Sequence, residues 1–246
     1  MYSEFKTPKK TYFLKTDKYV CNKFGLAEFF ALSCEKLNLK KGISVLDAGC
    51  GVFPLGIFFA SQYDCYVTGV ELNHLACKLA RENIKTHGIE NKAKILEGDF
   101  SKLVNSYSGA NFDLIVANPP IDTKISENEI NRFSNTDFFN LDDETFSYLT
   151  NSWHSSDGRD FLDFIFEIGQ KNLTENGKII ITFCTIDLDN PEYVSEKAKM
   201  YDFGEQFRVS DFIEPESIGA QNHTKEKIKA FTVCFTKGKD IWKTLK

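Results

Sequence analysis

Short apolar runs alternate with helical segments along most of the chain, and this order limits the possible folds more than any other feature. Between strand-like runs lie segments with helical spacing, at 52–62, 74–88 and 161–173. Such alternation favours parallel strands joined by right-handed crossovers, with helices on both faces of one sheet. We therefore predict an α/β doubly wound fold with its ligand site at the carboxyl ends of the strands. The strand-like runs are 43–48, 66–71, 93–98, 112–117 and 178–184.

The rest of the chain fits around this pattern. Helical spacing precedes the first strand at 22–38, and a helix near 191–203, a weak strand near 207–213 and a last strand at 230–238 close the sequence. At 246 residues and 42% hydrophobic composition, one domain with a single large core is expected. We predict one domain over 1–246, with a helical extension at 1–40 and a substrate-facing loop at 121–157.

Composition argues against several functional classes. The net charge of −5 disfavours a broad nucleic-acid surface, although lysines at 6, 9, 10, 15 and 18 make the N-terminal part locally basic. The seven cysteines form no CxxC pair and the four histidines lack ligand spacing, so neither a disulfide framework nor a metal site is predicted. No apolar run approaches the roughly 18 residues of a membrane span, and no secretory signal is visible. These features predict a cytoplasmic protein without membrane contact; they do not indicate an oligomeric state.

Each of the first four predicted strands ends in glycine or polar residues suited to a ligand. The first end, VLDAGCG, has glycines spaced as in dinucleotide-binding loops, but that motif needs a third glycine where this chain has Pro54. An acidic residue at this strand end would also lie poorly beside a pyrophosphate. A dinucleotide ligand is therefore disfavoured. The ends are 47–51, 71, 99–100 and 118–120.

The first loop suits a ligand that carries an adenosine and a positive centre. Gly49 and Gly51 allow the backbone to approach a ligand closely, and Asp47 can attract an ammonium group directly or through water. Taken without the other ends, both glycines could simply form a turn.

The next two strand ends complete this prediction. Glu71 can accept two hydrogen bonds from ribose hydroxyls. Asp99 can accept one from the exocyclic amine of adenine, and Phe100 can cover the ring. Considered alone, Glu71 could be a solvated residue at the end of a strand, and Asp99 could be a helix N-cap. These alternatives are less favoured when the three strand ends are considered together.

These motifs resemble the class I S-adenosylmethionine-dependent methyltransferases over about residues 40–185. The resemblance rests on VLDAGCG (45–51), VTGVE (67–71), EGDF (97–100) and NPP (118–120). It implies a Rossmann-like, seven-stranded, mostly parallel sheet with an antiparallel last strand, and S-adenosyl-L-methionine as the cofactor. Phe53 stands where the family often has a third glycine, a departure expected to affect the methionine end of the pocket. The implied cofactor-binding residues are Asp47, Gly49, Gly51, Glu71, Asp99, Phe100 and Asn118.

The fourth strand end predicts the chemistry. In this family, NPP followed by an aromatic residue is typical of enzymes that methylate a planar nitrogen, and the resemblance makes Asn118 and Pro119 the catalytic residues. An amide or amidine-like NH₂ is a poor nucleophile because its lone pair is delocalised. The Asn118 carboxamide oxygen and the Pro119 carbonyl can accept its two protons, and the fixed φ angles of the prolines keep that carbonyl aimed inward. Direct attack on the sulfonium methyl then needs neither metal nor covalent intermediate.

Two departures bear on the acceptor. Ile121 replaces the aromatic residue that would stack on a nucleobase, unless an aromatic of the long loop supplies the platform. SSDGRDFLDF (155–164) is similar to a segment of the release-factor glutamine methyltransferases. Those enzymes carry a separate N-terminal recruiting domain, and because only roughly 40 residues precede the first strand here, we expect that part to be absent or different. The loop aromatics are Phe133, Phe138, Phe139 and Trp153.

Three functions remain open. The leading hypothesis is methylation of an amide or amine nitrogen in a protein side chain or small molecule. The second is methylation of an exocyclic amine in rRNA or tRNA, supported by the basic N-terminal part and by Lys225, Lys227 and Lys229. The third is an inactive S-adenosylmethionine-binding module, favoured by Phe53 and Ile121 but opposed by the intact Asn118.

Overall fold

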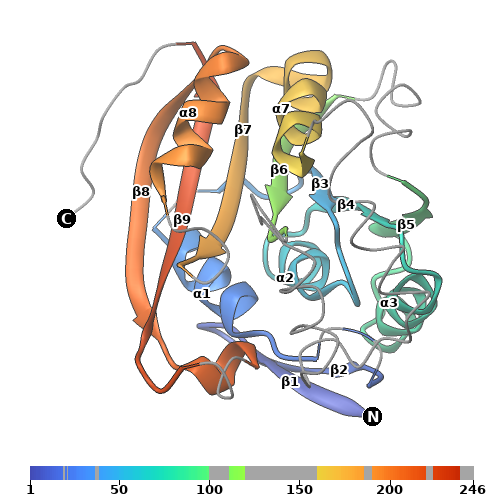
Figure 1. Cartoon of the computed structure of the whole chain (residues 1–246). Coiled ribbons are helices and arrows are strands. Elements are labelled where there is room, and N and C mark those ends of the chain that lie inside the picture. The colour runs from blue at the N-terminus through green and yellow to red at the C-terminus, as the bar shows by residue number, and fades with distance from the viewer. Residues whose placement is uncertain are drawn as a thin grey trace.

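A seven-stranded sheet in the order β5-β4-β3-β6-β7-β9-β8 runs through the molecule (Figure 1). The computed structural model describes residues 1–18, 20, 22–36, 39–99, 111–119, 160–185, 190–219 and 224–238. Strands β3 to β7 pair in parallel, and β9 lies antiparallel between β7 and β8, which confirms the predicted sheet. The strands are β3 (Ser44–Ala48), β4 (Tyr66–Glu71), β5 (Ala93–Glu97), β6 (Phe112–Ala117), β7 (Leu173–Cys184), β8 (Phe203–Ile213) and β9 (Ile228–Lys237).

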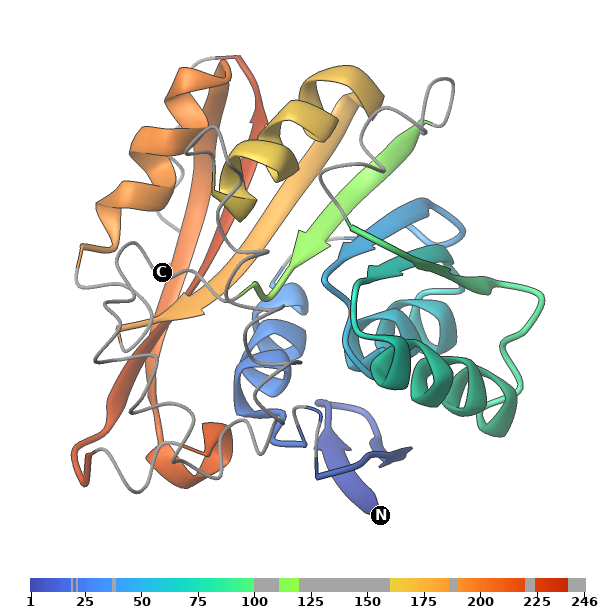
Figure 2. The same ribbon diagram turned by 45° about the vertical axis from the view of Figure 1, so that its right-hand side comes forward.

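Helices cover both faces of this sheet, as the alternating pattern predicts (Figures 1 and 2). Helices α1 (Gly25–Cys34), α2 (Pro54–Gln62) and α3 (His74–Thr86) bury their apolar residues with Val45, Val67 and Val116 of the sheet. Helices α7 (Phe161–Asn172) and α8 (Glu192–Met200) pack on the opposite face. Adjacent residues of β3, Val45 and Leu46, enter different clusters because successive side chains of a strand point to opposite faces.

The boundaries of α3 follow from its sequence. The Asn73 side chain accepts hydrogen bonds from the N–H groups of Leu75 and Ala76, at 2.9 and 3.2 Å, which confirms it as the N-cap. Gly88 follows the helix with φ of +66°, and the next N–H, of Ile89, donates to the Ile84 carbonyl. A left-handed glycine with this hydrogen bond is a common way to end a helix.

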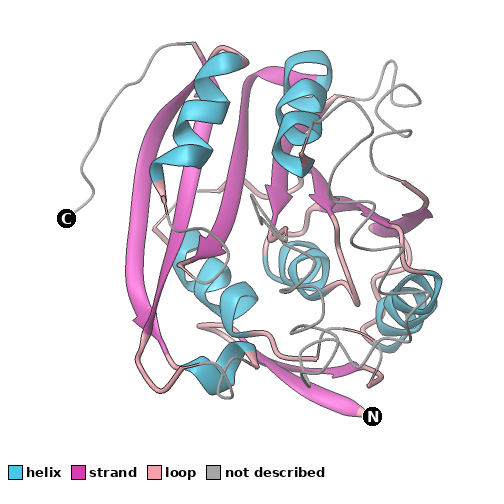
Figure 3. Cartoon of the chain, viewed as in Figure 1, coloured by secondary structure: helices cyan, strands magenta, loops and turns pink. Residues whose placement is uncertain are grey.

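The helical extension predicted for residues 1–40 is wrong in its first part. Tyr2–Lys6 (β1) and Thr11–Lys15 (β2) form an antiparallel hairpin, shown at the bottom of Figure 3 in magenta, and α1 is the helix of this region. The side chains of Phe5, Tyr12 and Leu14 are buried and that of Phe13 is exposed, so burial alternates along β2, as in a strand with one buried face. In this segment the alternation of buried and exposed side chains, which suits a strand, decides the structure over any helical tendency of the residues.

Two later strands are longer than predicted. β7 begins at Leu173, directly after α7, and β8 begins at Phe203. Gly177 and Gly204 weaken the strand signal at these starts in the sequence. In the structure Gly204 pairs with Thr236 of β9, and Leu173 pairs with Phe112 of β6 before a register shift that ends at Lys178.

The remaining sequence predictions concern membrane helices, metal sites, disulfides, the 121–157 loop and the number of domains. Within the described ranges, no helix is long and apolar enough to cross a membrane, and no group of three or more histidine, cysteine or acidic residues could hold a metal ion. The six described cysteines are free and buried. The loop predicted at 121–157 lies outside the described residues, and the division into one domain stays a prediction.

Candidate functional site

The pairing of the strands brings three of the predicted residues to one edge of the sheet. Ala48 of β3 pairs with Val70 of β4 and with Ala117 of β6. The next residue on each strand or strand end is Gly49, Glu71 or Asn118, so these three lie side by side at the carboxyl edge. Parallel strands necessarily present these ends together.

The neighbouring residues extend the same edge. Glu71 pairs with Glu97 of β5, and Asp99, partly buried, follows two residues later. Asn118 is half-buried and Pro119 is buried. Phe100 lies outside the described residues. The structure thus gathers Asp47, Gly49, Gly51, Glu71, Asp99, Asn118 and Pro119 around one edge of the sheet.

The Glu71 carboxylate holds the loop that follows β3. Its Oε2 accepts a hydrogen bond from the Gly51 N–H, and its Oε1 accepts from the N–H groups of Leu72 and Asn73, each at 2.8 Å. Burial raises the pKa of Glu71, although these three donors oppose the shift. A carboxylate has about four acceptor positions, so one is left for a ribose hydroxyl, whereas the sequence predicts two such bonds.

Asp47 lies beneath the same loop. Its side chain is 2% exposed, and its Oδ2 accepts a hydrogen bond of 3.1 Å from the Gly56 N–H in the first turn of α2. Burial raises the pKa of Asp47 to about 7; the Gly56 N–H opposes this and the charge of Glu71 adds to it. Of the two predicted routes to an ammonium group, burial favours the one through water.

The loop itself leaves room for a ligand. Gly49 and Gly51 have φ angles of +70° and +54°, a region that favours glycine. Among the residues that the structure describes, a Cβ atom on Gly51 would meet nothing within 4 Å, and one on Gly49 would meet the ring of Phe161, 3.5 Å away. Open space over two glycine backbones, beside the remaining acceptor of Glu71, fits an adenosine ligand bound edge-on to the sheet.

Phe53 has a left-handed backbone, a conformation that favours glycine. Its φ angle is +76°, yet its side chain is fully buried. A Cβ on Gly56 or on Gly69 would lie 2.0 or 2.7 Å from the Phe53 ring. The ring therefore fills the core over these two glycines. An effect of Phe53 on the methionine end of the pocket stays a prediction.

Sequence reasoning missed the contribution of α7. Asp160 and Asp163 form a capping box at its start, and the Tyr193 hydroxyl donates to Asp160. Asp163 accepts hydrogen bonds from Lys197 of α8, at 2.8 Å, and from the Tyr201 hydroxyl, at 2.9 Å. Burial alone would raise the pKa of Asp163, but Lys197 and the other donors hold it below its usual value.

This network fixes the start of α7 next to the glycine loop. Phe161, the first residue of the helix, is the neighbour of Gly49 noted above. The D-x-x-D spacing in GRDFLDF was a visible signal for the capping box. The partners on α8 come from more than 30 residues away, and no local pattern pointed to them.

Comparison with known proteins relates part of the chain to methyltransferases. Residues 30–135 match the model of the methyltransferase small domain family. A tRNA1(Val) (adenine(37)-N6)-methyltransferase of Haemophilus influenzae is 33% identical over 110 residues, which are 42% of this chain and 47% of that protein. A ribosomal protein L11 methyltransferase of Caldanaerobacter subterraneus is 39% identical over 80 residues, 32% of this chain and 24% of that protein. The chain thus spans about half the length, or less, of these relatives.

Solved structures match over more of the chain. A precorrin-6y C5,15-methyltransferase of Geobacter metallireducens gives a TM-score of 0.57 at 14% identity, covering 92% of this chain and 93% of the other. A methyltransferase of Pyrococcus furiosus gives 0.55 at 13% identity, covering 92% and 88%. At such identities the likeness concerns the fold. Together with the family match, it confirms the resemblance to S-adenosylmethionine-dependent methyltransferases and supports S-adenosylmethionine as the cofactor.

Because the backbone of Phe53 is left-handed, we predict that replacement by glycine destabilises the protein less than replacement by alanine, the reverse of the order expected within a helix. Phe53→Ala and Phe53→Gly both leave a cavity, at about 3–5 kcal/mol. We expect Phe53→Gly to be the more stable of the two by about 1 kcal/mol, because only glycine adopts this φ without strain. Denaturant unfolding of both variants measures the difference.

Phe58 provides the control, because it is fully buried in the middle of α2. There the glycine variant should be the less stable one by about 1 kcal/mol, since glycine is unfavourable within a helix. The same order at both positions would contradict the strain at Phe53.

Asp47 predicts a pH dependence of stability. Between its ordinary pKa of 3.8 and about 7, the folded protein holds a proton that the unfolded chain has lost. The free energy of unfolding therefore falls as the pH rises through this window, by at most about 1.4 kcal/mol per pH unit. In Asp47→Asn this fall should be absent, so the stability of the variant relative to wild type should increase from pH 4 to pH 7. Parallel curves in urea unfolding across these pH values would show that Asp47 is ionised throughout.

Proposed function

We propose that this chain, which has the fold of the class I methyltransferases, transfers a methyl group from S-adenosylmethionine to the amine nitrogen of a planar acceptor. The observation that carries this proposal is the strand register. It sets Asn118 beside Gly49, so that an amine-binding group and a cofactor-binding loop share one edge of the sheet. S-adenosylmethionine, when bound, supplies a methyl group on a positively charged sulfur.

The residues of the edge divide into two sets. Glu71, through its remaining acceptor position, would bind the ribose, and Gly49 and Gly51 would allow close approach of the cofactor. Asp47 would favour its positive charge from beneath the loop. Asp99 and Phe100 would bind the adenine, as the motif resemblance implies, and Asn118 borders both cofactor and acceptor.

Asn118 and Pro119 would act on the acceptor. The carboxamide oxygen of Asn118 and the carbonyl of Pro119 would each accept one N–H of the acceptor amine, which turns the nitrogen lone pair toward the methyl group. Pairing of β6 with β3 and β7 fixes the strand that precedes them. Catalysis would come from positioning and exclusion of water, without a covalent intermediate.

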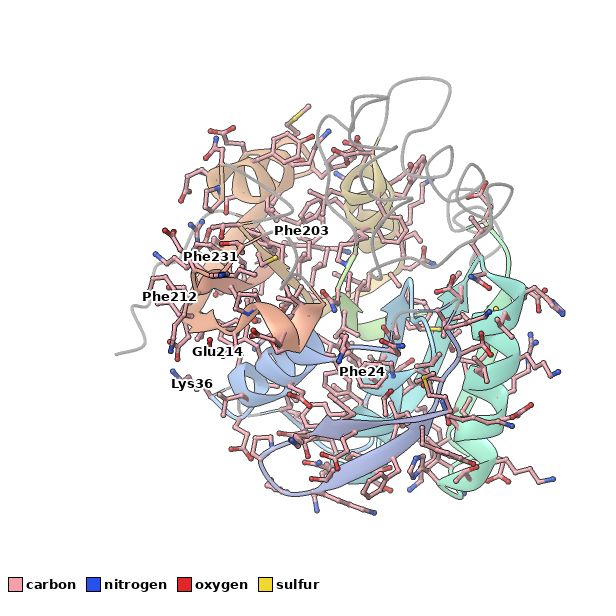
Figure 4. The ribbon with its side chains drawn as sticks, turned by 60° about the horizontal axis from the view of Figure 1, so that its bottom comes forward. Phe24, Lys36, Phe203, Phe212, Glu214 and Phe231 are labelled. Carbon is pink, nitrogen blue, oxygen red and sulfur yellow. The ribbon has the colours of Figure 1, made fainter. Side chains whose placement is uncertain are left out.

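The acceptor is a planar amine or amide, in a protein, a small molecule or RNA. Relatives named as adenine N6-methyltransferases of tRNA favour an exocyclic base amine. The structure weakens the support that the C-terminal lysines give to an RNA acceptor, because two of them have partners within the protein. Lys227 pairs with Glu214, at 2.8 Å, and the Lys229 ammonium lies 5.2 Å from the centre of the Phe231 ring; Glu214 and Phe231 are labelled in Figure 4.

One of the two supports for the inactive-module alternative is weaker in the structure, because Phe53 buries its ring in the core. Ile121 lies outside the described residues, and Asn118 remains in place at the end of β6.

Cofactor binding tests the first part of the proposal. Glu71→Ala removes a charged acceptor from the ribose, so the affinity for S-adenosylmethionine should fall by about 1.5–3 kcal/mol, or roughly 10- to 150-fold in Kd. Isothermal titration calorimetry measures this change.

Glu97→Ala is the matched control for this experiment. Glu97 pairs with Glu71 in the sheet, but its carboxylate binds His74 and Arg81 on an exposed surface. The affinity of this variant should equal that of wild type. Absence of binding by wild type, or equal affinities for wild type and Glu71→Ala, would overturn the assignment.

Methyl transfer tests the second part. Labelled S-adenosylmethionine is incubated with protein, RNA and small-molecule fractions of a cell extract, and the labelled fraction identifies the acceptor class. With that acceptor, Asn118→Ala should lower turnover by roughly 10²–10³, by analogy with loss of other positioned polar groups, while cofactor affinity changes far less. Asn118→Asp keeps an oxygen acceptor and should retain part of the activity. If Asn118→Ala turned over the acceptor at the wild-type rate, the proposed role of Asn118 would be wrong, and the NPP motif would serve only to end strand β6.

A further inference from the structure

The side-chain amide of Asn83 connects the N-terminal hairpin to the glycine loop. Its Oδ1 accepts a hydrogen bond of 2.7 Å from the Lys15 N–H, the last residue of β2. Its Nδ2 donates to two carbonyls, of Lys15 at 3.1 Å and of Val52 at 3.0 Å. Asn83 lies on α3 and is 1% exposed, so these bonds form away from water.

The Val52 carbonyl belongs to the loop that the cofactor would contact. Val52 stands between Gly51, whose N–H donates to Glu71, and Phe53, whose backbone is left-handed. The loop is therefore held at two successive residues, by a carboxylate at Gly51 and by an amide at Val52. Loss of the Asn83 donor would leave the carbonyl of a buried residue without this partner, and the loop would shift to recover a hydrogen bond.

The hairpin does not depend on Asn83 alone. Gln62, at the end of α2, donates to the Thr7 hydroxyl at 2.6 Å and to the Tyr12 hydroxyl at 3.2 Å. The Lys6 N–H donates to Glu28 of α1 at 2.7 Å. Three buried side chains anchor the hairpin further: Phe5, Tyr12 and Leu14.

From this arrangement we infer that Asn83 is a positioning residue for cofactor binding, through which the docked hairpin fixes the glycine loop. The inference rests on the proposed function for the identity of the cofactor. Among the hairpin contacts described here, that of Asn83 also reaches the loop, through the Val52 carbonyl, and those of Gln62 and Glu28 do not. Loss of the Asn83 side chain therefore has a structural effect on the loop that does not depend on which cofactor binds.

The experiment compares two ways of weakening the hairpin. Asn83→Leu keeps the number and branching of the side-chain heavy atoms but removes all three hydrogen bonds. Gln62→Leu removes hydrogen bonds to the hairpin and none to the loop. Two quantities are measured at a temperature where both variants are folded. One is the Kd for S-adenosylmethionine by calorimetry, and the other is the hydrogen-exchange rate of a peptide spanning residues 49–53.

We expect Asn83→Leu to weaken cofactor binding about 5-fold or more and to speed exchange in residues 49–53 by a similar factor. Gln62→Leu should lower the melting temperature but leave both quantities at their wild-type values. Equal effects of the two variants, or no effect of Asn83→Leu, would overturn the inference. If Asn83→Leu fails to fold, Asn83→Ser is used in its place with the same expectations.

The two readouts separate the two claims. Failure of wild type to bind S-adenosylmethionine would contradict the proposed function, while the exchange rates would still decide whether Asn83 fixes the loop. Binding by wild type with unchanged exchange in the Asn83 variants would contradict the positioning role alone.

Discussion

The site depends on one partly buried acceptor, the Glu71 carboxylate, which receives hydrogen bonds from three backbone N–H groups. One of these belongs to the glycine loop after β3 and two belong to the turn after β4, so a single side chain fixes two strand ends relative to each other. Such an arrangement needs parallel neighbours in register, because only then do both ends meet at one edge. The three donors offset the cost of partly burying the carboxylate.

The glycine loop illustrates why a motif is a statement about backbone rather than about residue identity. Phe53 stands where the family often has glycine, and its backbone is left-handed, a conformation that favours glycine. The strain of that conformation is tolerated because the ring packs over Gly56 and Gly69, where no side chain stands in its way. A departure from a family's sequence pattern therefore need not change the loop when the new side chain can pack in the core, as the Phe53 ring does.

Much of the fold could be predicted from the sequence, because the signals are local. Strands β4 and β6 have the predicted limits, and the Asn73 cap is read from four residues. The hairpin was missed because β1 and β2 are short and their buried side chains contact helices far along the chain. The same holds for Lys197 and Asn83, whose roles depend on partners 34 and 68 residues away. Site residues at strand ends were visible; residues that support them through tertiary contacts were not.

The charges of the site favour a cationic ligand over an anionic one. Burial raises the pKa values of both Asp47 and Glu71, and the charge of Glu71 further disfavours ionisation of Asp47. A positive group bound over the loop would stabilise both carboxylates at once, whereas a pyrophosphate would add a third negative charge to a poorly hydrated site. Under the proposed function, these charges would favour a sulfonium or an ammonium group at a glycine loop of the kind that binds phosphates elsewhere. Selection between the two kinds of ligand thus comes from the acids beside the loop, more than from the glycines within it.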